Sequence, residues 1–379
     1  MRVLVDGRVI QDRYHGIGRH TLELLRAIPE SVDVEWVVLV AEPPGRFSAR
    51  DLSGRPDVQL VPVHTPVVSL SAQASWPGLL RRLRPDVVFE PYHLAVPWLH
   101  GRIPVATIVH DCIFETDPAF APSQGFRRMY RVATRLALAR ADAVATISHA
   151  TRADLRRFYG FRVSEDSVVP HAVGTQFRVA DARPAARPDD LPPRYVLHVG
   201  VRRPHKDHAT LVRAFHLLRQ RMPDVSLVLV GENDKRFPDP VPALVASLGL
   251  GRHVSWYPRV SEERLIDLYR HADLFAFTSL IEGFGLPVLE AMAAGAPVVA
   301  SDAPAVVEAS AGAALVVPRG DPVAWSVAME GVLREPLLAR ELSAAGRRAA
   351  GGTTWRTSAL AILDLLRRAA DQPSEEALT

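Results

Sequence analysis

The stretch Ser279–Ser301 reads SLIEGFGLPVLEAMAAGAPVVAS, and its order of residue types predicts a strand end, a turn, a helix and a further strand. Gly283 and Gly285 in the turn carry no Cβ, so the backbone can approach a ligand closely. Pro287 suits the first turn of a helix, where its missing N–H costs nothing. The free N–H groups at the start of that helix favour anionic or hydroxyl-rich ligands. The stretch therefore indicates an α/β fold with a ligand-binding turn.

Two glutamates flank this turn, Glu282 before it and Glu290 inside the helix. One interpretation is purely structural: Glu282 caps the helix and Glu290 is a solvated acid. However, Glu290 lies among apolar residues, and a charge in such surroundings needs a partner or a ligand. We therefore expect the two carboxylates to bind hydroxyl groups of a sugar-containing ligand at separate points.

Outward from this stretch, short apolar runs alternate with amphipathic segments along the chain. Continuous apolar strands separated by helices are typical of parallel sheets covered on both faces, the doubly wound α/β class. We expect two Rossmann-like domains that face each other across a cleft. The expected strands are Val3–Val5, Glu35–Val40, Val87–Phe89, Val105–Val109, Ala143–Ile147, Tyr195–Val199, Ser226–Val230, Val254–Trp256, Leu274–Phe277 and Pro297–Ala300, and the clearest helices are Thr21–Ile28, Arg127–Ala139 and Thr210–Arg221.

The alternation breaks once, in the proline-rich residues 180–194. Prolines without periodicity predict a linker. We therefore expect a first domain at residues 1–179 and a second at residues 195–352. Residues 353–379 contain an amphipathic helix around Ser358–Ala370, which we expect to pack back on the first domain.

The composition is that of a globular chain: of 379 residues, 48% are hydrophobic and 23% are charged, with a net charge of +3. These values argue against wholesale disorder, and the charge is too small for a nucleic-acid-binding surface. No apolar run approaches the ~20 residues of a membrane span, and the first ten residues do not read as a signal peptide. The single cysteine, Cys112, excludes an internal disulfide. We therefore expect a soluble, cytoplasmic protein.

A second informative stretch, Tyr195–Leu218, predicts a strand, a basic loop and a helix. The loop carries Arg202, Arg203 and Lys206 at the carboxyl end of a parallel strand, the edge where ligands bind in open α/β sheets. Such a cluster can neutralise phosphate oxygens and stabilise a departing diphosphate. The alternative is a solvated basic loop. Because Lys206 is one of only two lysines among 45 basic residues, we favour the functional interpretation.

Together these motifs resemble the retaining GT-B glycosyltransferases of family 4, which include bacterial mannosyl-, glucosyl- and rhamnosyltransferases. Residues 282–290 match the family's E-x7-E arrangement, and residues 200–206 match its phosphate-binding strand–loop–helix. Further motifs follow in the family's order over nearly the whole chain, at Gly16–His20, Thr107–Asp111, Ala145–Leu155, Val230–Asn233 and Val316–Pro322.

The resemblance implies a role for each matching residue of the second domain, which would bind the nucleotide sugar. Lys206, with Arg202 or Arg203, would bind the donor diphosphate. Glu282 would hold donor sugar hydroxyls, and Glu290 would bind the nucleotide ribose. The other donor-binding residues implied in this domain are Gly231, Arg259, Val260, Gly283, Phe284, Gly285 and Leu286.

The first domain would bind the acceptor and supply the remaining site residues. By the resemblance, Gly16 and Gly18 lie in a glycine-rich loop near the diphosphate. His110 would contact the donor sugar beside the anomeric carbon, and Asp111 would orient His110 or touch the acceptor. The alternative for His110 is a hydrogen-bonded core residue at a strand end. A His–Asp pair at the carboxyl edge of a strand favours the functional role.

Two positions depart from the family pattern. The family's phosphate-binding arginine occurs just after the strand glycine or just before the lysine, where this chain has Val201 and His205. The choice between the two arginines of the loop therefore stays open. The family's Pro-Asn-Gly-Val stretch is here Pro170–Val173, with His171 in place of the asparagine.

We expect no metal and no cofactor other than the donor substrate. No metal-ligand spacing of the HExxH type occurs, and no Asp-x-Asp triplet is present. In this interpretation the basic loop takes the charge-neutralising part. Cys112, two residues after His110, is expected to be a small buried hydrophobe rather than a nucleophile.

One basic helix could have a second partner. Arg127, Arg128, Arg131 and Arg135 fall at helical spacing in the first domain. They would form either a membrane-surface contact at the inner face of the membrane, as in relatives that glycosylate lipid-linked acceptors, or a solvated face over an apolar stripe.

The activity implied by the resemblance is retaining, metal-independent hexosyl transfer from a nucleotide-diphosphate sugar to an acceptor hydroxyl of a glycan, a lipid-linked sugar or a natural product. GDP-mannose is the first donor expected, followed by UDP- or dTDP-sugars. The alternatives are a nucleotide-sugar epimerase of the same fold and a non-catalytic subunit that keeps the fold without the chemistry.

Overall fold

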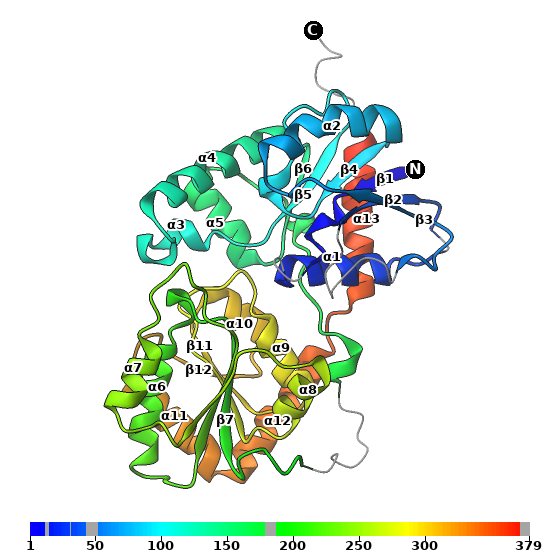
Figure 1. The fold of residues 1–379 in the computed structure, drawn as a ribbon. Helices are drawn as coiled ribbons and strands as arrows, with labels where there is room; N and C mark the ends of the chain where they lie inside the picture. Colours follow the sequence, from blue (N-terminus) through cyan, green and yellow to red (C-terminus); the bar gives the residue numbers. More distant parts are fainter. Residues whose placement is uncertain (12–14, 31, 43–51, 179–186, 372–379) are drawn as a thin grey trace. The chain divides into compact units, whose positions relative to one another are not determined.

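The computed structural model describes residues 1–11, 15–30, 32–42, 52–178 and 187–371. The described chain forms two compact α/β units (Figure 1). The first unit combines residues 1–115, 124–171 and 354–379, and the second combines residues 116–123 and 172–353. Of the expected linker 180–194, residues 180–186 lie outside the described residues.

Each unit is built on a six-stranded sheet in which every recorded strand pair is parallel. The doubly wound class expected from the apolar runs is thus confirmed. In spatial order the first sheet is β3 (Val58–Val63), β2 (Glu35–Ala41), β1 (Arg2–Val5), β4 (Val87–Glu90), β5 (Val105–Val109) and β6 (Ala143–Thr146). The second sheet is β12 (Leu315–Val317), β11 (Val298–Ser301), β10 (Leu274–Phe277), β7 (Tyr195–Val199), β8 (Ser226–Val230) and β9 (Val254–Tyr257).

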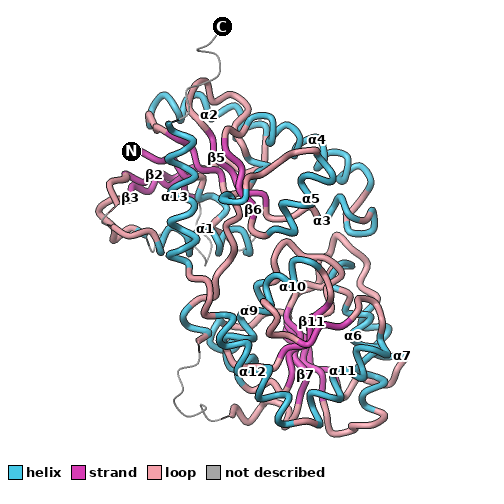
Figure 2. Tube along the Cα trace, turned by 180° about the vertical axis from the view of Figure 1, so that it is seen from behind, coloured by secondary structure: helices cyan, strands magenta, loops and turns pink. Residues whose placement is uncertain are grey.

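Helices cover both faces of each sheet (Figure 2). Those of the first unit are α1 (His15–Ala27), α2 (Leu70–Leu83), α4 (Gln124–Arg140), α5 (His149–Tyr159) and α13 (Trp355–Asp371), with the short α3 (Ile113–Thr116) leading out of it. Those of the second unit are α6 (His208–Arg219), α7 (Val241–Ser247), α8 (Glu262–Arg270), α9 (Leu286–Ala293), α10 (Pro304–Ser310), α11 (Pro322–Arg334) and α12 (Pro336–Ala350). No helix formed by the described residues is both long and apolar enough to cross a membrane.

The core of the first unit lies between its sheet and these helices. On one face, Trp76 and Leu80 of α2 pack with Leu4 and Val88 of the central strands. On the other face, α13 runs beside α1 and against β4, β5 and β6 (Figure 1). The amphipathic helix expected near residue 360 therefore covers a sheet whose strands come from the other end of the chain.

The second unit has the same layered arrangement. Helices α6 and α11 pack together on one side of the strands, and α9 packs with α12 on the other (Figure 2). Its core is almost wholly apolar and includes Phe215, Leu227, Trp325 and Met329, which are all fully buried. The rigid framework leaves the carboxyl ends of β7 and β10 as the places where polar side chains gather.

Candidate active site

The carboxyl ends of β7 and β10 bring the basic loop and the glycine-rich turn of the sequence together in the second unit. The Lys206 Nζ donates to Glu282 Oε1 at 2.5 Å, and both side chains are largely buried. Lys206 also lies over the Phe277 ring, 5.2 Å from its centroid. The loop is fixed to β10 by backbone groups, since the Thr278 hydroxyl donates to the carbonyl of Lys206 and the Leu280 N–H to that of His205.

The neighbouring arginines differ in how firmly they are held. The Nε of Arg202 donates to Asp239 at 2.8 Å and its NH1 to the Gly231 carbonyl at 3.0 Å, while its guanidinium lies over Trp256. Arg203 donates a side-chain hydrogen bond from Nε to Asp234 at 2.7 Å. Its side chain is 33% exposed, against 16% for Arg202.

The Asp234 carboxylate accepts hydrogen bonds from two arginines, Arg203 and Arg236. Hydrogen bonds from Arg236 and the positive charge of Arg203 hold the pKa of the Asp234 carboxyl far below its usual range. The carboxylate therefore stays charged and keeps both guanidinium groups in place at neutral pH. Asp234 and Asp239 were not predicted as site residues, although both acids lie in the short run that follows the β8 strand end.

Buried histidines surround the lysine. His205 is 2% exposed, and burial, followed by the charges of Lys206 and Arg203, holds its pKa well below the usual value. Burial likewise lowers the pKa of His198 to about 4. Because these rings are neutral, the positive charge of the loop is concentrated on Lys206 and the arginines.

The glycine-rich turn begins α9 as the sequence predicts. Gly285 has φ +109° and precedes the helix, whose first turn has no side-chain cap. Gly283, Phe284 and Leu286 complete the turn, and Phe284 is 7% exposed. The amide end of α9 therefore lies directly beside Glu282.

Glu290 is 6% exposed on the second turn of α9 and accepts a hydrogen bond from the Tyr269 hydroxyl at 3.0 Å. A solvated acid is thus wrong for Glu290, and Tyr269 is a partner that the sequence analysis did not identify. The periodic apolar pattern of α8 gave no sign that one of its buried rings would carry a needed hydroxyl.

Three further expected residues border the β8 edge of the site. A Cβ on Gly231, which has φ +137°, would lie 2.2 Å from the Gly200 carbonyl oxygen, so only glycine fits between the two strand ends. Arg259 is exposed and pairs with Glu232 at 2.5 Å, and Val260 follows it.

The expected residues of the first unit lie at the end of β5 and in α1. The His110 Nε2 donates to the Pro91 carbonyl at 2.9 Å, so the proton is on Nε2 and Nδ1 carries the lone pair. Burial lowers the pKa of His110 to about 4. The Asp111 carboxylate accepts from the Ile113 N–H at 3.1 Å, at the start of α3. The recorded partner that orients His110 is therefore a backbone carbonyl.

Gly16 and Gly18 lie in α1, and the expectation of a glycine-rich loop at these positions is wrong. A Cβ on Gly18 would lie 2.3 Å from the Val9 carbonyl oxygen, whereas Gly16 faces open space. Gly18 thus permits close packing of α1 on the segment after β1. Residues 12–14, just before the helix, lie outside the described residues.

Cys112 and two of the α4 arginines have structural roles inside the first unit. Cys112 is 2% exposed, and burial raises the pKa of its thiol, so it is a small buried group as expected. On α4, Arg127 donates to the carbonyls of Phe114 and Glu115, and Arg131 pairs with the Glu115 carboxylate. Two of the four arginines are therefore used inside the unit.

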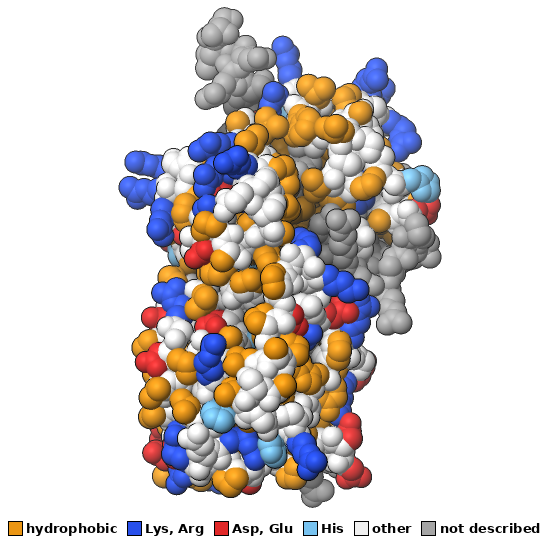
Figure 3. All heavy atoms as spheres, turned by 60° about the vertical axis from the view of Figure 1, so that its left-hand side comes forward, with side chains coloured by type: hydrophobic (Ala, Val, Ile, Leu, Met, Phe, Trp, Pro, Cys, Tyr) orange, Lys and Arg blue, Asp and Glu red, His pale blue; other side chains and the backbone are white. Residues whose placement is uncertain are grey.

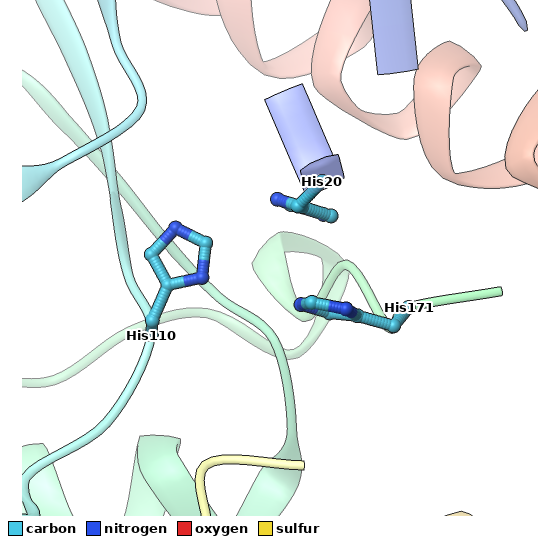
Figure 4. Close-up of side chains that lie close together, drawn as sticks. All are labelled: His20, His110 and His171. Atoms are coloured by element: carbon cyan, nitrogen blue, oxygen red, sulfur yellow. The ribbon is translucent and has the colours of Figure 1, made fainter. Parts of the chain in front are cut away.

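The first unit also contains a group of three buried histidines, His20, His110 and His171 (Figure 4). One ligand atom from each lies within 4.8 Å of the others. Only His110 was predicted as a site residue, because the three histidines come from distant segments and no local spacing links them.

Comparisons with known proteins cover both units. Residues 14–177 match a family model described as "Glycosyltransferase Family 4", and residues 181–349 match one described as "Glycosyl transferases group 1". A similar relative is the D-inositol 3-phosphate glycosyltransferase of Kineococcus radiotolerans, 32% identical over 304 residues that cover 74% of this chain and 68% of the relative. Alignments with the two relatives that follow cover 62% and 73% of those proteins, so the chain spans about two thirds of their length.

Solved structures share the fold. Sucrose-phosphate synthase (tll1590) from Thermosynechococcus elongatus has a TM-score of 0.76 at 20% identity, over 97% of this chain and 98% of that one. Alr3699/HepE of Anabaena, solved in complex with UDP and glucose, has a TM-score of 0.74 at 18% identity, over 97% and 99%.

Proposed function

The chain belongs to the group 1 glycosyltransferases of family 4, retaining hexosyltransferases with the GT-B fold that take a sugar from a nucleotide sugar, and we propose that Lys206 and Glu282 form the centre of its donor site. The observation that carries the proposal is the 2.5 Å contact between the two side chains. A diphosphate beside this lysine would lie next to a carboxylate able to accept hydrogen bonds from the sugar's hydroxyls. The charge of the lysine and the acceptor oxygens of the glutamate match the two halves of such a donor.

Arg203 is the better second phosphate ligand. Three contacts hold the Arg202 guanidinium against Asp239, Gly231 and Trp256, and they stabilise the loop. Arg203 is bound to Asp234 through Nε, so its terminal nitrogens can reach an oxyanion without giving up that contact. A planar guanidinium can then bind phosphate through two nitrogens.

The rest of the donor would bind along α9 and the β8 edge. Main-chain N–H groups of the residues 283–286 turn would bind the sugar and phosphate oxygens at the positive end of the helix. Glu290, oriented by Tyr269, would accept hydrogen bonds from the ribose hydroxyls. Gly231 would border the base, as would the backbone at Arg259 and Val260.

The first unit would act on the sugar and the acceptor. With Nε2 committed to Pro91, the Nδ1 of His110 is the atom that can accept a hydrogen bond from a donor sugar hydroxyl. Asp111 lies next to it in the chain and would contact the acceptor side. Gly18, and Gly16 at the start of α1, would lie on the diphosphate side.

The chemistry follows from these positions. The bond between the anomeric carbon and the diphosphate oxygen breaks, and its electron pair leaves with the diphosphate, whose growing charge Lys206 and Arg203 stabilise. The acceptor oxygen bonds to the anomeric carbon on the same face, which retains configuration. Its proton passes to the departing phosphate oxygen, so no protein nucleophile and no metal-assisted step is invoked.

Donor identity is the finer part of the proposal. GDP-mannose is the first donor, with UDP- and dTDP-hexoses next, and the acceptor is a hydroxyl of a glycan, a lipid-linked sugar or a natural product. A thermal-shift panel of GDP, UDP and dTDP tests the base, because a ligand that binds only the folded state raises its apparent stability. Turnover of the matching nucleotide sugar is then followed with and without acceptor. Nucleotide release that does not depend on the acceptor would indicate an epimerase or hydrolase instead, and no binding by any nucleotide would indicate a non-catalytic subunit.

We further propose a peripheral membrane contact on α4, at the cytoplasmic face of the membrane. Arg128 and Arg135 are exposed together with Met129 and Val132, which are 50% and 64% exposed. With the α3–α5 side of the first unit turned forward, basic and hydrophobic side chains are interspersed over that unit (Figure 3). A helix face of this composition binds anionic lipid surfaces.

Co-sedimentation with vesicles tests this contact. Binding to phosphatidylglycerol vesicles, absent with phosphatidylcholine vesicles and lost in the double variant Arg128→Glu/Arg135→Glu, is the expected result. Equal sedimentation of the variant and the unsubstituted chain would show that α4 is a solvated face.

A further inference from the structure

The three buried histidines of the first unit form a cluster that the donor site does not explain. His20 lies on α1, His110 directly after β5, and His171 in the segment after β6 and α5. They are 1%, 7% and 6% exposed. In Figure 4 one ring nitrogen of each histidine points toward the space between the side chains. Nothing else in the described part of the chain groups three ligand-type side chains in this way.

The hydrogen bonding of His110 and His20 leaves nitrogen lone pairs available. The Nε2–H of His110 donates to Pro91, so its Nδ1 faces the cluster as an acceptor. Neither ring nitrogen of His20 has a hydrogen-bond partner among the described residues, although the side chain is almost fully buried. A buried polar nitrogen without a partner costs free energy, and buried groups of this kind are usually satisfied by a protein group, a water or an ion.

The three rings pack against one another, and His20 and His171 also pack against Trp355. His20 and His171 stack at 4.3 Å with an interplanar angle of 9°, and His110 meets them edge-on at 5.2 and 6.1 Å. Trp355, at the start of α13, lies 5.5 Å from His20 and 5.9 Å from His171. Burial favours the neutral imidazole, which is the form that binds metal ions.

We propose that His20, His110 and His171 form a binding site for one divalent transition-metal ion, with Zn²⁺ as the best fit. Imidazole nitrogen is a preferred ligand of Zn²⁺, and three histidines with a water in the fourth position are a known zinc arrangement. At Zn–N distances of about 2.0–2.1 Å, tetrahedral ligand nitrogens lie about 3.4 Å apart. From a separation of at most 4.8 Å, each ring therefore moves inward by less than about 1 Å, and the His20–His171 stack tilts open.

The surroundings of His110 support ligation. A backbone carbonyl that accepts from the far ring nitrogen is the usual outer contact of a metal-binding histidine, because it fixes the tautomer and the ring orientation. The Pro91 carbonyl already makes this contact. A water molecule bridging the three rings is the competing explanation, and it predicts no metal uptake.

The site goes beyond the proposed transfer reaction and uses one of its atoms. The Nδ1 of His110 can either accept from a sugar hydroxyl or bind the ion, so the two uses exclude each other. The ion would also join α1, the end of β5 and the segment that leaves the first unit, with Trp355 of α13 packed beside it.

The test measures metal binding directly and does not depend on turnover. The full chain is treated with EDTA, dialysed, loaded with Zn²⁺ and freed of loose metal by gel filtration, and bound zinc is then counted per chain. Co²⁺ titration gives a second readout, since tetrahedral Co²⁺ has strong visible absorption. We expect one ion per chain, tetrahedral Co²⁺ absorption and a Zn²⁺-dependent rise of the Tm.

Two site variants and one matched control locate the ion. His171→Asn introduces the residue that resembling proteins carry at this position, and His20→Gln keeps a polar side chain of similar size. His93→Gln changes another buried histidine of the same unit that lies outside the cluster and contacts Thr134. Loss of one ligand should weaken Zn²⁺ binding by more than the 10–100-fold of an outer-contact change, whereas the control should bind normally.

Two results would overturn the proposal. The first is an unsubstituted chain that retains no stoichiometric zinc. The second is a single bound ion that both site variants keep with unchanged affinity. The Tm of each variant in EDTA shows that it is folded, so loss of binding cannot be confused with loss of structure. Because no step uses a nucleotide sugar, failure of the donor-site proposal leaves this test intact.

Discussion

Replacement of Lys206 by alanine should remove most of the transfer activity. The ammonium contacts Glu282 at 2.5 Å and is 14% exposed, so it acts where water screens charge only weakly. In the proposed reaction the same charge stabilises the leaving diphosphate. The variant therefore loses an interaction that strengthens as the donor bond breaks, and kcat should fall more than donor affinity.

The expected decrease in kcat follows from the electrostatic interaction of one charge pair. At about 4 Å, two unit charges interact by about 4 kcal/mol at an effective dielectric constant near 20. Each 1.36 kcal/mol in the barrier is tenfold in rate, so full loss corresponds to about 10³. Glu282 offsets part of the lysine charge, which lowers the expected decrease in kcat to about 10²–10³.

The chain offers a matched control for this measurement. Lys235 is the second lysine of the chain and is exposed in the same unit, so Lys235→Ala makes the same chemical change away from the pair. Initial rates are measured at saturating acceptor over a range of donor concentrations, for both variants and the unsubstituted chain. The Tm of each protein shows that the fold is kept.

Two outcomes would refute the reasoning. A Lys206→Ala variant that is folded and retains kcat within about threefold has no lysine-assisted departure, since threefold in rate corresponds to only about 0.65 kcal/mol, less than a quarter of the energy behind a 10²-fold decrease. An equal loss in Lys235→Ala would show that the effect is one of net charge and not of the Lys206–Glu282 contact.

Three other substitutions probe separate parts of the structure. Tyr269→Phe removes the 3.0 Å hydrogen bond to the buried Glu290 carboxylate. We expect a several-fold higher donor KM, a nearly unchanged kcat and a loss of about 1–3 kcal/mol in the free energy of unfolding. An unchanged donor KM would argue against ribose binding by Glu290. Gly231→Ala places a Cβ 2.2 Å from a backbone oxygen and should abolish nucleotide-induced stabilisation. Gly249→Ala, where φ is +67° but the space is open, should lower the free energy of unfolding by only about 1 kcal/mol. Equal Tm values for the two variants would contradict the clash at Gly231. Burial and then the nearby Asp6 charge raise the pKa of Glu90, so the folded state binds the Glu90 proton more strongly and the free energy of unfolding falls as pH rises above about 4.5. Urea unfolding of Glu90→Gln at several pH values should show a flatter dependence of the unfolding free energy on pH. An unchanged pH dependence would exclude Glu90 as its source.

The central strands and the donor loops could be predicted from sequence because they depend on local signals. Runs such as Val105–Val109 are buried on both faces and are therefore continuously apolar. The edge strands β3 and β12 were not among the expected runs. Both contain exposed residues and are not continuously buried, because one side of an edge strand meets fewer neighbours.

The site residues divide in the same way. Glu282, Glu290 and Lys206 stand in short motifs whose spacing is fixed by a turn and a helix, so their neighbourhood could be inferred. Tyr269 contacts Glu290, and Asp239 contacts Arg202, only through the packing of separate elements. No spacing along the chain carries that information, and the same holds for the group formed by His20, His110 and His171.

The position of α1 shows how a local signal can mislead. Glycines at 16 and 18 suggested a loop, yet both lie in a helix. The small side chain at Gly18 serves close approach to the Val9 carbonyl and not a change of chain direction. Tertiary packing thus overrode the weak helix propensity of glycine.

Helix α13 gives the first unit an unusual order of assembly on the ribosome. Its buried side chains Ile362, Leu363 and Leu366 seal one side of a sheet whose strands emerge more than two hundred residues earlier. The second unit has all its own strands and helices by then and can finish first. Until α13 is synthesised, the amino-terminal half of the nascent chain exposes the apolar sheet surface that α13 later covers. This exposure makes it the part of the chain most dependent on chaperones during synthesis.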